Sequence, residues 1–258
     1  MSIFDQKVIK YEMKPLSSLE KVFPDETPVY RMECQMLSGL WGETVSFQVA
    51  YTGDFVMRER LDVRVVSELA EHVHVRTVEM VPVGRATNGI VDDNYLKTTS
   101  GLYPDLLKDL KDGKVIVYSR QWRSLWVDVD ITNEIPAGEY EIELQLIKEG
   151  EVVCSAKQKV TVIGTELPKL DIMHTEWMHA DCLADYYHVE VFSEEHWKLL
   201  ENYFQEYVKR DCNMMLTPLF TSPLDTAIGL ERTTCQLIDV EVKDGEYVFG
   251  FEKLKRWI

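Results

Sequence analysis

The sequence predicts a multi-domain protein with an all-β, Ig-like sandwich over residues 1–165 and the first βα units of a (β/α)8 TIM-type barrel over residues 166–258. Before about residue 165, apolar and polar side chains alternate with a period of two, which is typical of half-buried strands. Turn sequences such as Thr52-Gly53-Asp54 separate these runs. Beyond this point the expected order becomes strand, helix, strand, hairpin, helix, which is typical of the start of a barrel.

The N-terminal runs indicate short antiparallel strands. In Glu43–Tyr51, alternation places Val45, Phe47 and Val49 on one face. Tyr140 follows Pro136 and precedes another alternating run, as in the tyrosine corner of Ig-like domains. Residues 94–110 are expected to form a loop with a helical turn. The other strands are expected at residues 61–66, 73–83, 114–119, 124–131, 139–147 and 158–163.

The C-terminal third predicts alternating strands and helices. Strands are expected at residues 170–177 and 213–220, and a helix begins after Ser193, a favourable N-cap residue followed by two glutamates. A hairpin should turn at Asp244 and Gly245, and another helix should follow it. A complete barrel needs about 250 residues, so we expect this chain to be a truncated, N-terminal portion of a longer protein.

Composition excludes several classes of function. The formal net charge of −16 disfavours nucleic acid and anionic membranes as partners, because phosphate contacts require Lys or Arg. No apolar run approaches the roughly 20 residues of a membrane-spanning helix. The N-terminus does not resemble a signal peptide, so a cytoplasmic location is expected. The 5 scattered cysteines argue against a disulfide framework and a structural zinc site, and we expect no cofactor.

Four segments resemble a known family. They are LDIMHTEWMHADCLADYY from Leu170, VFSEEHWKLLENYF from Val191, NMMLTPLFTSPLDT from Asn213 and GFEKLKRWI from Gly250. Together with the preceding strands, they are similar to bacterial glycoside hydrolase family 123 and its uncharacterised relatives. The resemblance implies a β-sandwich followed by a β/α barrel, and activity as a β-N-acetylgalactosaminidase. In such retaining enzymes the acetamido group of the substrate is the nucleophile, an Asp orients it and an adjacent Glu is the general acid.

The chain departs from that pattern at the catalytic pair. Its one adjacent Asp-Glu sequence is Asp25-Glu26, which lies in the sandwich half, so the catalytic role is not transferred to it. We therefore expect no catalytic residue within this chain, a catalytic pair encoded after Ile258, and a fragment that is inactive alone. Whether the parent protein is an active enzyme stays open.

Candidate substrate-binding residues follow the two expected strands, because functional groups of barrels lie where strands end. Aromatic rings would stack on a sugar and polar groups would bind its hydroxyls. Asp225, in a Pro-bounded loop, is the strongest single candidate for a substrate contact. The candidates are His174, Trp177, His179, Asp181, Phe220, Asp225 and Arg232.

Structural explanations stand beside these roles. Trp177 is equally compatible with an interface between domains. His174 and His179 could ligate a metal or anchor a loop, but no third ligand has suitable spacing, so no metal site is predicted. Asp181 could serve only as a turn former or helix cap.

Two functions remain. The chain is expected to be part of a glycoside hydrolase acting on carbohydrate, with an N-acetylhexosaminide as the candidate substrate. The alternative is a non-catalytic module that binds carbohydrate or another protein. The sequence does not select the sugar, the linkage or the oligomeric state.

Overall fold

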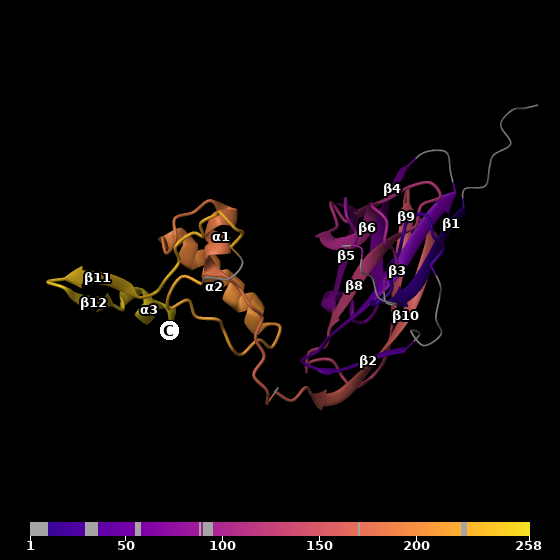
Figure 1. The fold of residues 1–258 in the computed structure, drawn as a ribbon. Helices are drawn as coiled ribbons and strands as arrows, with labels where there is room; N and C mark the ends of the chain where they lie inside the picture. The colour runs from indigo at the N-terminus through magenta and orange to yellow at the C-terminus, as the bar shows by residue number, and fades with distance from the viewer. Residues whose placement is uncertain are drawn as a thin grey trace, which may run out of the picture. The chain divides into compact units, whose positions relative to one another are not determined.

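The structure is a computed structural model that describes residues 10–28, 36–54, 58–87, 89, 95–169, 171–222 and 226–258. The chain divides into two compact units, Met1–Leu167 and Pro168–Ile258 (Figure 1). Each unit has hydrophobic clusters of its own, and each is described separately below.

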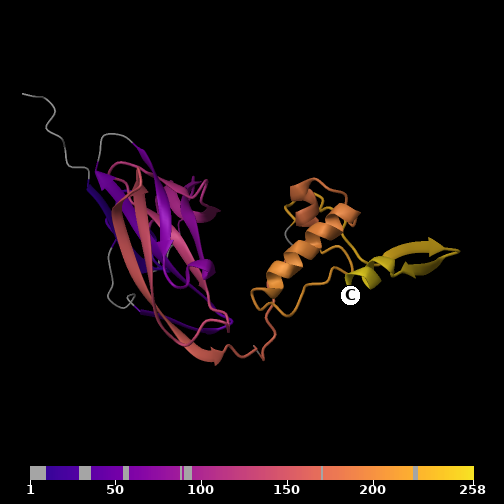
Figure 2. The same ribbon diagram turned by 180° about the vertical axis from the view of Figure 1, so that it is seen from behind.

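The first unit contains two five-stranded sheets (Figure 1). Neighbouring strands are antiparallel except at one pair, β2 and β10, which run parallel. Strand β10 is the longest of the described strands, and it is visibly curved (Figure 2). The first sheet contains, in spatial order, β1 (Lys10–Ser17), β3 (Thr44–Asp54), β8 (Arg123–Asp130), β5 (Val73–Val83) and β6 (Gly101–Asp109). The second contains β2 (Met36–Trp41), β10 (Glu151–Glu166), β9 (Gly138–Lys148), β4 (Glu59–Val66) and β7 (Lys114–Val117).

Both sheets contribute to one hydrophobic cluster. Phe47 and Val49, which alternation placed on one face of β3, are 1% and 0% exposed. Ile142 and Leu144 of β9, in the other sheet, are 0% exposed in the same cluster. Burying each such side chain contributes about 1.5–3 kcal/mol, so this shared cluster is the main source of stability of the unit.

The expected tyrosine-corner hydrogen bond is present. The hydroxyl of Tyr140 donates to the carbonyl oxygen of Pro136 at 2.8 Å. The carbonyl oxygen of the preceding residue, Ile135, accepts a hydrogen bond from the indole Nε1 of Trp41 at 2.9 Å. These two bonds fix the turn that enters β9.

One segment of this unit was predicted wrongly. Residues 101–109, expected in a loop, form strand β6, which pairs with β5. Pro104 lies in this strand beside a register shift opposite Met80. Proline is tolerated there because β6 is the last strand of its sheet, where a missing N–H breaks no ladder. Strands β1 and β2 were likewise not foreseen, and a short 3₁₀ turn, Ala70–His72, precedes β5.

The second unit contains helices α1 (Ala180–Tyr187), α2 (Glu194–Val208) and α3 (Glu252–Trp257), and a hairpin of β11 (Asp239–Lys243) and β12 (Glu246–Gly250). The predicted start of α2 is confirmed, since the Ser193 hydroxyl accepts from the amide of His196 at 3.2 Å. The hairpin turn is also confirmed: Asp244 and Gly245 have φ angles of 53° and 86°. Two positive φ angles in a two-residue turn match the twist of a hairpin.

The strands expected at residues 170–177 and 213–220 do not form in the described chain. Among the described residues, the backbones of the two segments are hydrogen-bonded to each other only at His174, whose carbonyl oxygen accepts from the amides of Asn213, at 3.0 Å, and Met214, at 3.1 Å. A barrel strand is hydrogen-bonded along both edges. Residues 213–220 make only isolated backbone bonds of this kind, since the amides of Leu237 and Ile238 donate to the carbonyl oxygens of Pro218, at 2.9 Å, and Leu219, at 3.2 Å. The one sheet described in this unit is therefore the hairpin, and the barrel stays a prediction.

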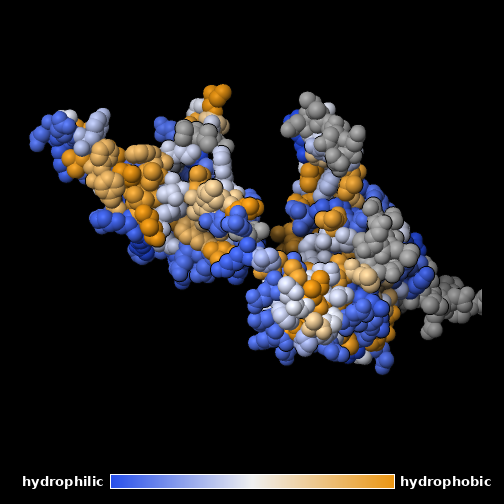
Figure 3. All heavy atoms as spheres, turned by 90° about the horizontal axis from the view of Figure 1, so that it is seen from below, coloured by the Kyte–Doolittle hydropathy of each residue, from blue (hydrophilic) through white to orange (hydrophobic). Residues whose placement is uncertain are grey.

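The hairpin carries an apolar face. Val240 pairs with Phe249 and Val242 with Tyr247, so these four side chains lie on one side, each between 39% and 71% exposed. Figure 3 shows hydrophobic surface along the hairpin behind its polar tip. None of the helices that the structure describes is long and apolar enough to cross a membrane.

Candidate functional site

A small pocket of about 140 Å³ brings several predicted residues together in the second unit. One wall is the chain leading into α1, with Trp177, His179 and Asp181, and the facing wall is the segment around Thr217 and Phe220. The remaining lining residues are Met178, Ala180, Leu216, Pro218, Thr221, Ser222 and Cys235.

The pocket combines exposed aromatic rings with a buried charged floor. Trp177 and Phe220 are 68% and 54% exposed, so their faces are available to a ligand. Asp181, in the first turn of α1, is 6% exposed. An aromatic rim around a few polar groups is typical of small-molecule sites.

Asp181 forms a bidentate ion pair with Arg232. Arg232 Nε lies 2.6 Å from Asp181 Oδ2, and Nη2 lies 2.9 Å from Oδ1. Both side chains are nearly buried, at 8% and 11% exposed. Thr233 continues this link by donating from its hydroxyl to Asp185 at 2.8 Å. Both carboxylate oxygens of Asp181 are thus engaged, which favours a role in holding the pocket wall over direct binding of a hydroxyl.

Cys235 closes the pocket beside this ion pair. Its backbone amide donates to the hydroxyl of Thr221 at 3.1 Å, and its side chain is 3% exposed. Burial, assisted by the negative charge of Asp181, raises the pKa of the Cys235 thiol to about 12. The thiol is therefore protonated near neutral pH and is unsuited to nucleophilic or metal chemistry.

Comparison with known proteins places this pocket in a family context. Residues 177–258 match the model of the glycoside hydrolase 123 catalytic domain. A family 123 glycoside hydrolase from Clostridium perfringens has a similar structure, with a TM-score of 0.67 and 13% identity over 96% of this chain and 44% of that one. The C-terminal part of this chain is therefore similar to the glycoside hydrolase 123 catalytic domain.

Other similarities are weaker. A β-glucosidase from Listeria innocua gives a TM-score of 0.28 at 10% identity over 62% of this chain and 17% of that one. The N-terminal domain of PorA gives 0.28 at 11% identity over 57% and 99%. No curated protein matches the chain. The chain spans less than half the length of the Clostridium perfringens structure.

All residues that line the pocket fall within the matched segment 177–258. The predicted residue His174 lies outside both the matched segment and the pocket. Its Nδ1 lies 3.2 Å from the carbonyl oxygen of Asp211, and its backbone amide donates to Asn213 Oδ1 at 2.8 Å. His174 thus connects two loop segments of the second unit. The remaining candidate, Asp225, lies outside the described residues.

Metal ligation has no geometric support in the part of the chain that the structure describes. No three His, Cys, Asp or Glu side chains converge there in a way that could hold an ion. His174 approaches Glu176 at 3.4 Å and Cys212 Sγ at 4.0 Å, while His179 lines the separate pocket.

The sequence analysis did not identify His196, which contacts the backbone of the pocket residue Ala180. It is 0% exposed; its Nδ1 accepts from the amide of Phe192 at 2.9 Å, and its Nε2 lies 2.9 Å from the carbonyl oxygen of Ala180. Burial lowers the pKa of His196, with opposing contributions from Ala180 and Asp181. A buried histidine within a helix has no signature in hydrophobic periodicity.

Proposed function

We propose that the chain is part of a glycoside hydrolase and that the pocket around Trp177 faces its carbohydrate substrate. The observation that carries this proposal is the gathering of Trp177, His179, Asp181 and Phe220 in one pocket within the segment that matches a glycoside hydrolase catalytic domain. In the proposed complex the exposed rings of Trp177 and Phe220 stack on a sugar face, and His179 and Thr217 bind its hydroxyls.

The volume of the pocket limits the size of the ligand that it can bind. About 140 Å³ is below the 300–1,000 Å³ range of pockets for drug-sized ligands. It suits part of one sugar residue, with the rest of the glycan extending past Trp177. We propose an N-acetylhexosaminide as the substrate. The solved family 123 enzyme is described as hydrolysing glycolipid glycans, which makes such glycans the first to test.

The proposed chemistry is substrate-assisted retaining hydrolysis, in which the acetamido oxygen of the sugar attacks the anomeric carbon. This chain is proposed to bind sugar without supplying the catalytic pair. Asp25 and Glu26 are solvent-exposed and lie in the first unit, where both pair with Lys97, at 3.4 Å and 2.7 Å. We therefore expect the chain alone to be inactive.

Titration with N-acetylgalactosamine, followed by NMR, tests the binding site. Trp177→Ala should weaken binding about threefold to tenfold, because a stacked ring contributes about 0.5–1.5 kcal/mol. Tyr186→Ala is the matched control, since Tyr186 is 76% exposed in the same unit and does not line the pocket. Equal affinities of the two variants would contradict the proposed site.

A non-catalytic carbohydrate-binding module is the second candidate. It is favoured by the pocket itself, where Asp181 is the one lining carboxylate and both its oxygens bind Arg232. Hydrolysis of nitrophenyl N-acetylgalactosaminides by the complete protein separates the two functions. Turnover supports the hydrolase, whereas sugar binding without turnover supports the module.

A further inference from the structure

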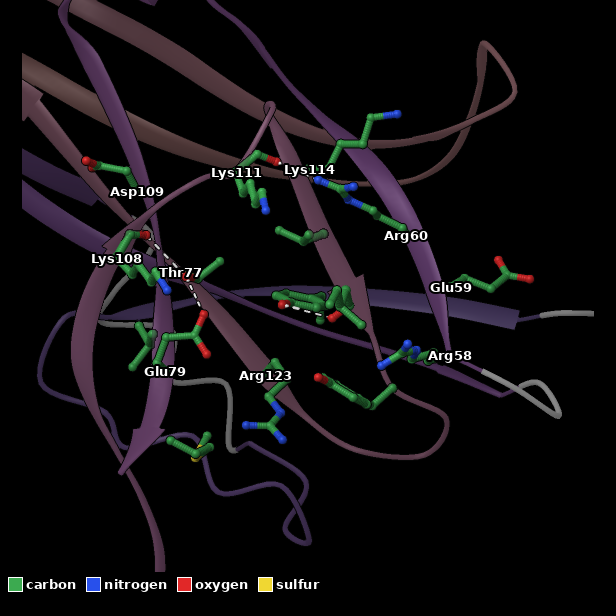
Figure 4. Close-up of a pocket in the computed structure, with 16 residues that line it drawn as sticks. Arg58, Glu59, Arg60, Thr77, Glu79, Lys108, Asp109, Lys111, Lys114 and Arg123 are labelled. Atoms are coloured by element: carbon green, nitrogen blue, oxygen red, sulfur yellow. Dashed lines mark hydrogen bonds between the residues drawn. The ribbon is translucent and has the colours of Figure 1, made fainter. Parts of the chain in front are cut away.

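The first unit contains a larger crevice, with a volume of about 690 Å³. It lies at the side of the unit where β6 and β7, the last strands of their sheets, are found. Residues of β4 and β7 line it from one sheet, and residues of β5, β6 and β8 from the other (Figure 4). Because both layers contribute walls, the feature is a crevice between sheets.

The crevice reverses the charge balance of the chain. Its lining contains 6 Lys or Arg and 3 Asp or Glu residues, whereas the whole chain has 28 and 44. A hollow lined by one sign of charge focuses the electrostatic potential and raises the local concentration of oppositely charged ligands. The crevice is therefore suited to an anion in an otherwise acidic protein.

Two of the three carboxylates point away from the crevice. Figure 4 shows Glu59 and Asp109 directed outward, while Glu79 faces the centre. Glu59 is already engaged, because Lys148 Nζ donates to its Oε1 at 2.8 Å and the hydroxyl of Tyr11 donates to its Oε2. Glu79 Oε1 accepts from the hydroxyl of Thr77 at 2.8 Å.

Arg123 has unused hydrogen-bonding capacity in this crevice. Its Nε is buried and has no hydrogen-bond partner among the described residues. Its Nη2 donates to a neutral group, Gln121 Oε1, at 3.2 Å, and its guanidinium lies 5.0 Å from the centre of the Tyr118 ring. A buried N–H without an acceptor is costly, so the described residues satisfy the guanidinium of Arg123 only in part.

Three further cations lack carboxylate partners within the described part of the chain. Arg58 and Lys108 line the crevice from opposite sides, Lys111 also lines it, and none of the three forms an ion pair there. By contrast, Arg60 pairs with Asp112 at 2.8 Å and Lys114 with Asp62 at 3.1 Å. The crevice thus holds four positive groups, counting Arg123, that are not neutralised by direct ion pairs among the described residues.

We propose that this crevice binds a saccharide residue carrying a carboxylate or sulfate group. The cations at Arg58, Lys108 and Arg123 would bind the anion, and the apolar lining and the Tyr118 ring would contact the sugar. Its volume lies within the range of small-ligand sites. The anion follows from the charges of the crevice, whereas the saccharide rests on the proposed function.

Calorimetric titration of the whole chain with four probes tests this assignment. The probes are methyl glucuronide, a sulfated N-acetylgalactosamine, neutral methyl glucoside and inorganic sulfate. Lys108→Gln should weaken binding of the preferred acidic sugar about tenfold, as expected for loss of one charge-assisted hydrogen bond. Lys159→Gln is the matched control, because Lys159 is an exposed lysine of β10 that does not line the crevice. Binding should also weaken as salt concentration rises.

Each outcome decides the proposal. Binding of one acidic sugar, with little binding of methyl glucoside and a specific loss in Lys108→Gln, supports it, and the preferred probe distinguishes carboxylate from sulfate. Inorganic sulfate binding as tightly as the sugars would refute the saccharide assignment. Equal losses in Lys108→Gln and Lys159→Gln would refute the site. The pocket around Trp177 is tested separately with neutral N-acetylgalactosamine, whereas the loss in Lys108→Gln reports on the crevice, so failure here is separable from failure of that pocket.

Discussion

Replacement of His196 is the sharpest test of how the candidate pocket is held in place. Its imidazole accepts from the amide of Phe192 through Nδ1 and contacts the carbonyl oxygen of Ala180 through Nε2, both at 2.9 Å. This pattern requires a neutral ring with its proton on Nε2. Because Ala180 lines the pocket, His196 connects the first turn of α2 to the pocket wall.

His196→Ala removes both hydrogen bonds and leaves a cavity at a position with 0% exposure. Each hydrogen bond contributes about 1 kcal/mol, and the cavity adds to the loss. The free energy of unfolding of the second unit should therefore fall by about 2–4 kcal/mol. Lys198→Ala, at an exposed position of the same helix, should change it by less than about 0.5 kcal/mol.

Hydrogen exchange measured by mass spectrometry is the appropriate assay, because it resolves the second unit from the first. Peptides covering residues 180–200 should lose protection in His196→Ala and retain it in Lys198→Ala. Peptides from the first unit should be unaffected in both variants. If His196→Ala exchanged no faster than Lys198→Ala, the bridging role of His196 would be refuted.

The same histidine predicts a pH dependence. Burial lowers the pKa of His196 in the folded state, below the value of about 6.5 in the unfolded chain. The unfolded state then binds more protons, so the stability of the second unit is complete above about pH 6.5 and falls as the pH decreases toward the folded-state pKa. His196→Gln should lack this component, and identical pH profiles for the two proteins would contradict it.

Three other contacts give measurable expectations. Asp181→Ala should destabilise the second unit by about 3–5 kcal/mol by leaving Arg232 unpaired, whereas Asp181→Leu combined with Arg232→Met should cost less; comparison by hydrogen exchange would refute this if both lost equally. Tyr140→Phe should lower the stability of the first unit by about 1 kcal/mol in urea unfolding, and no change would mean that its hydrogen bond to Pro136 is not stabilising. Iodoacetamide should modify Cys182, which is exposed, faster than Cys235, whose pKa is raised to about 12; peptide mapping that showed the reverse order would contradict the burial of Cys235.

The strands of the first unit were largely predictable because alternation reports burial on one face. Strand β5 begins and ends at the predicted residues, Val73 and Val83. Strand β6 was not predictable, since Leu102 and Leu106 are 52% and 57% exposed and Pro104 interrupts the pattern. A strand at the edge of a sheet buries neither face fully, so its sequence lacks the period on which prediction depends.

The candidate pocket was predictable in its residues but not in its construction. Trp177, His179, Asp181 and Phe220 were chosen because they follow two expected strands, and they do line one pocket. The described chain brings them together differently, through the first turn of α1. That helix has only 8 residues, and an isolated helix of this length is unstable in water.

Contacts distant in sequence supply what α1 lacks. Arg232 binds its first turn from 51 residues away, and His196 contacts the carbonyl oxygen of Ala180 from the next helix. Since local sequence cannot reveal such partners, the dependence of α1 on them is the part of the site that only the structure discloses. Whether the four pocket residues contact sugar stays a prediction, but its test depends on these supports: a variant that loosens α1 would abolish binding without touching the ligand. Trp177→Ala avoids this ambiguity because Trp177 precedes α1 and its side chain is mostly exposed.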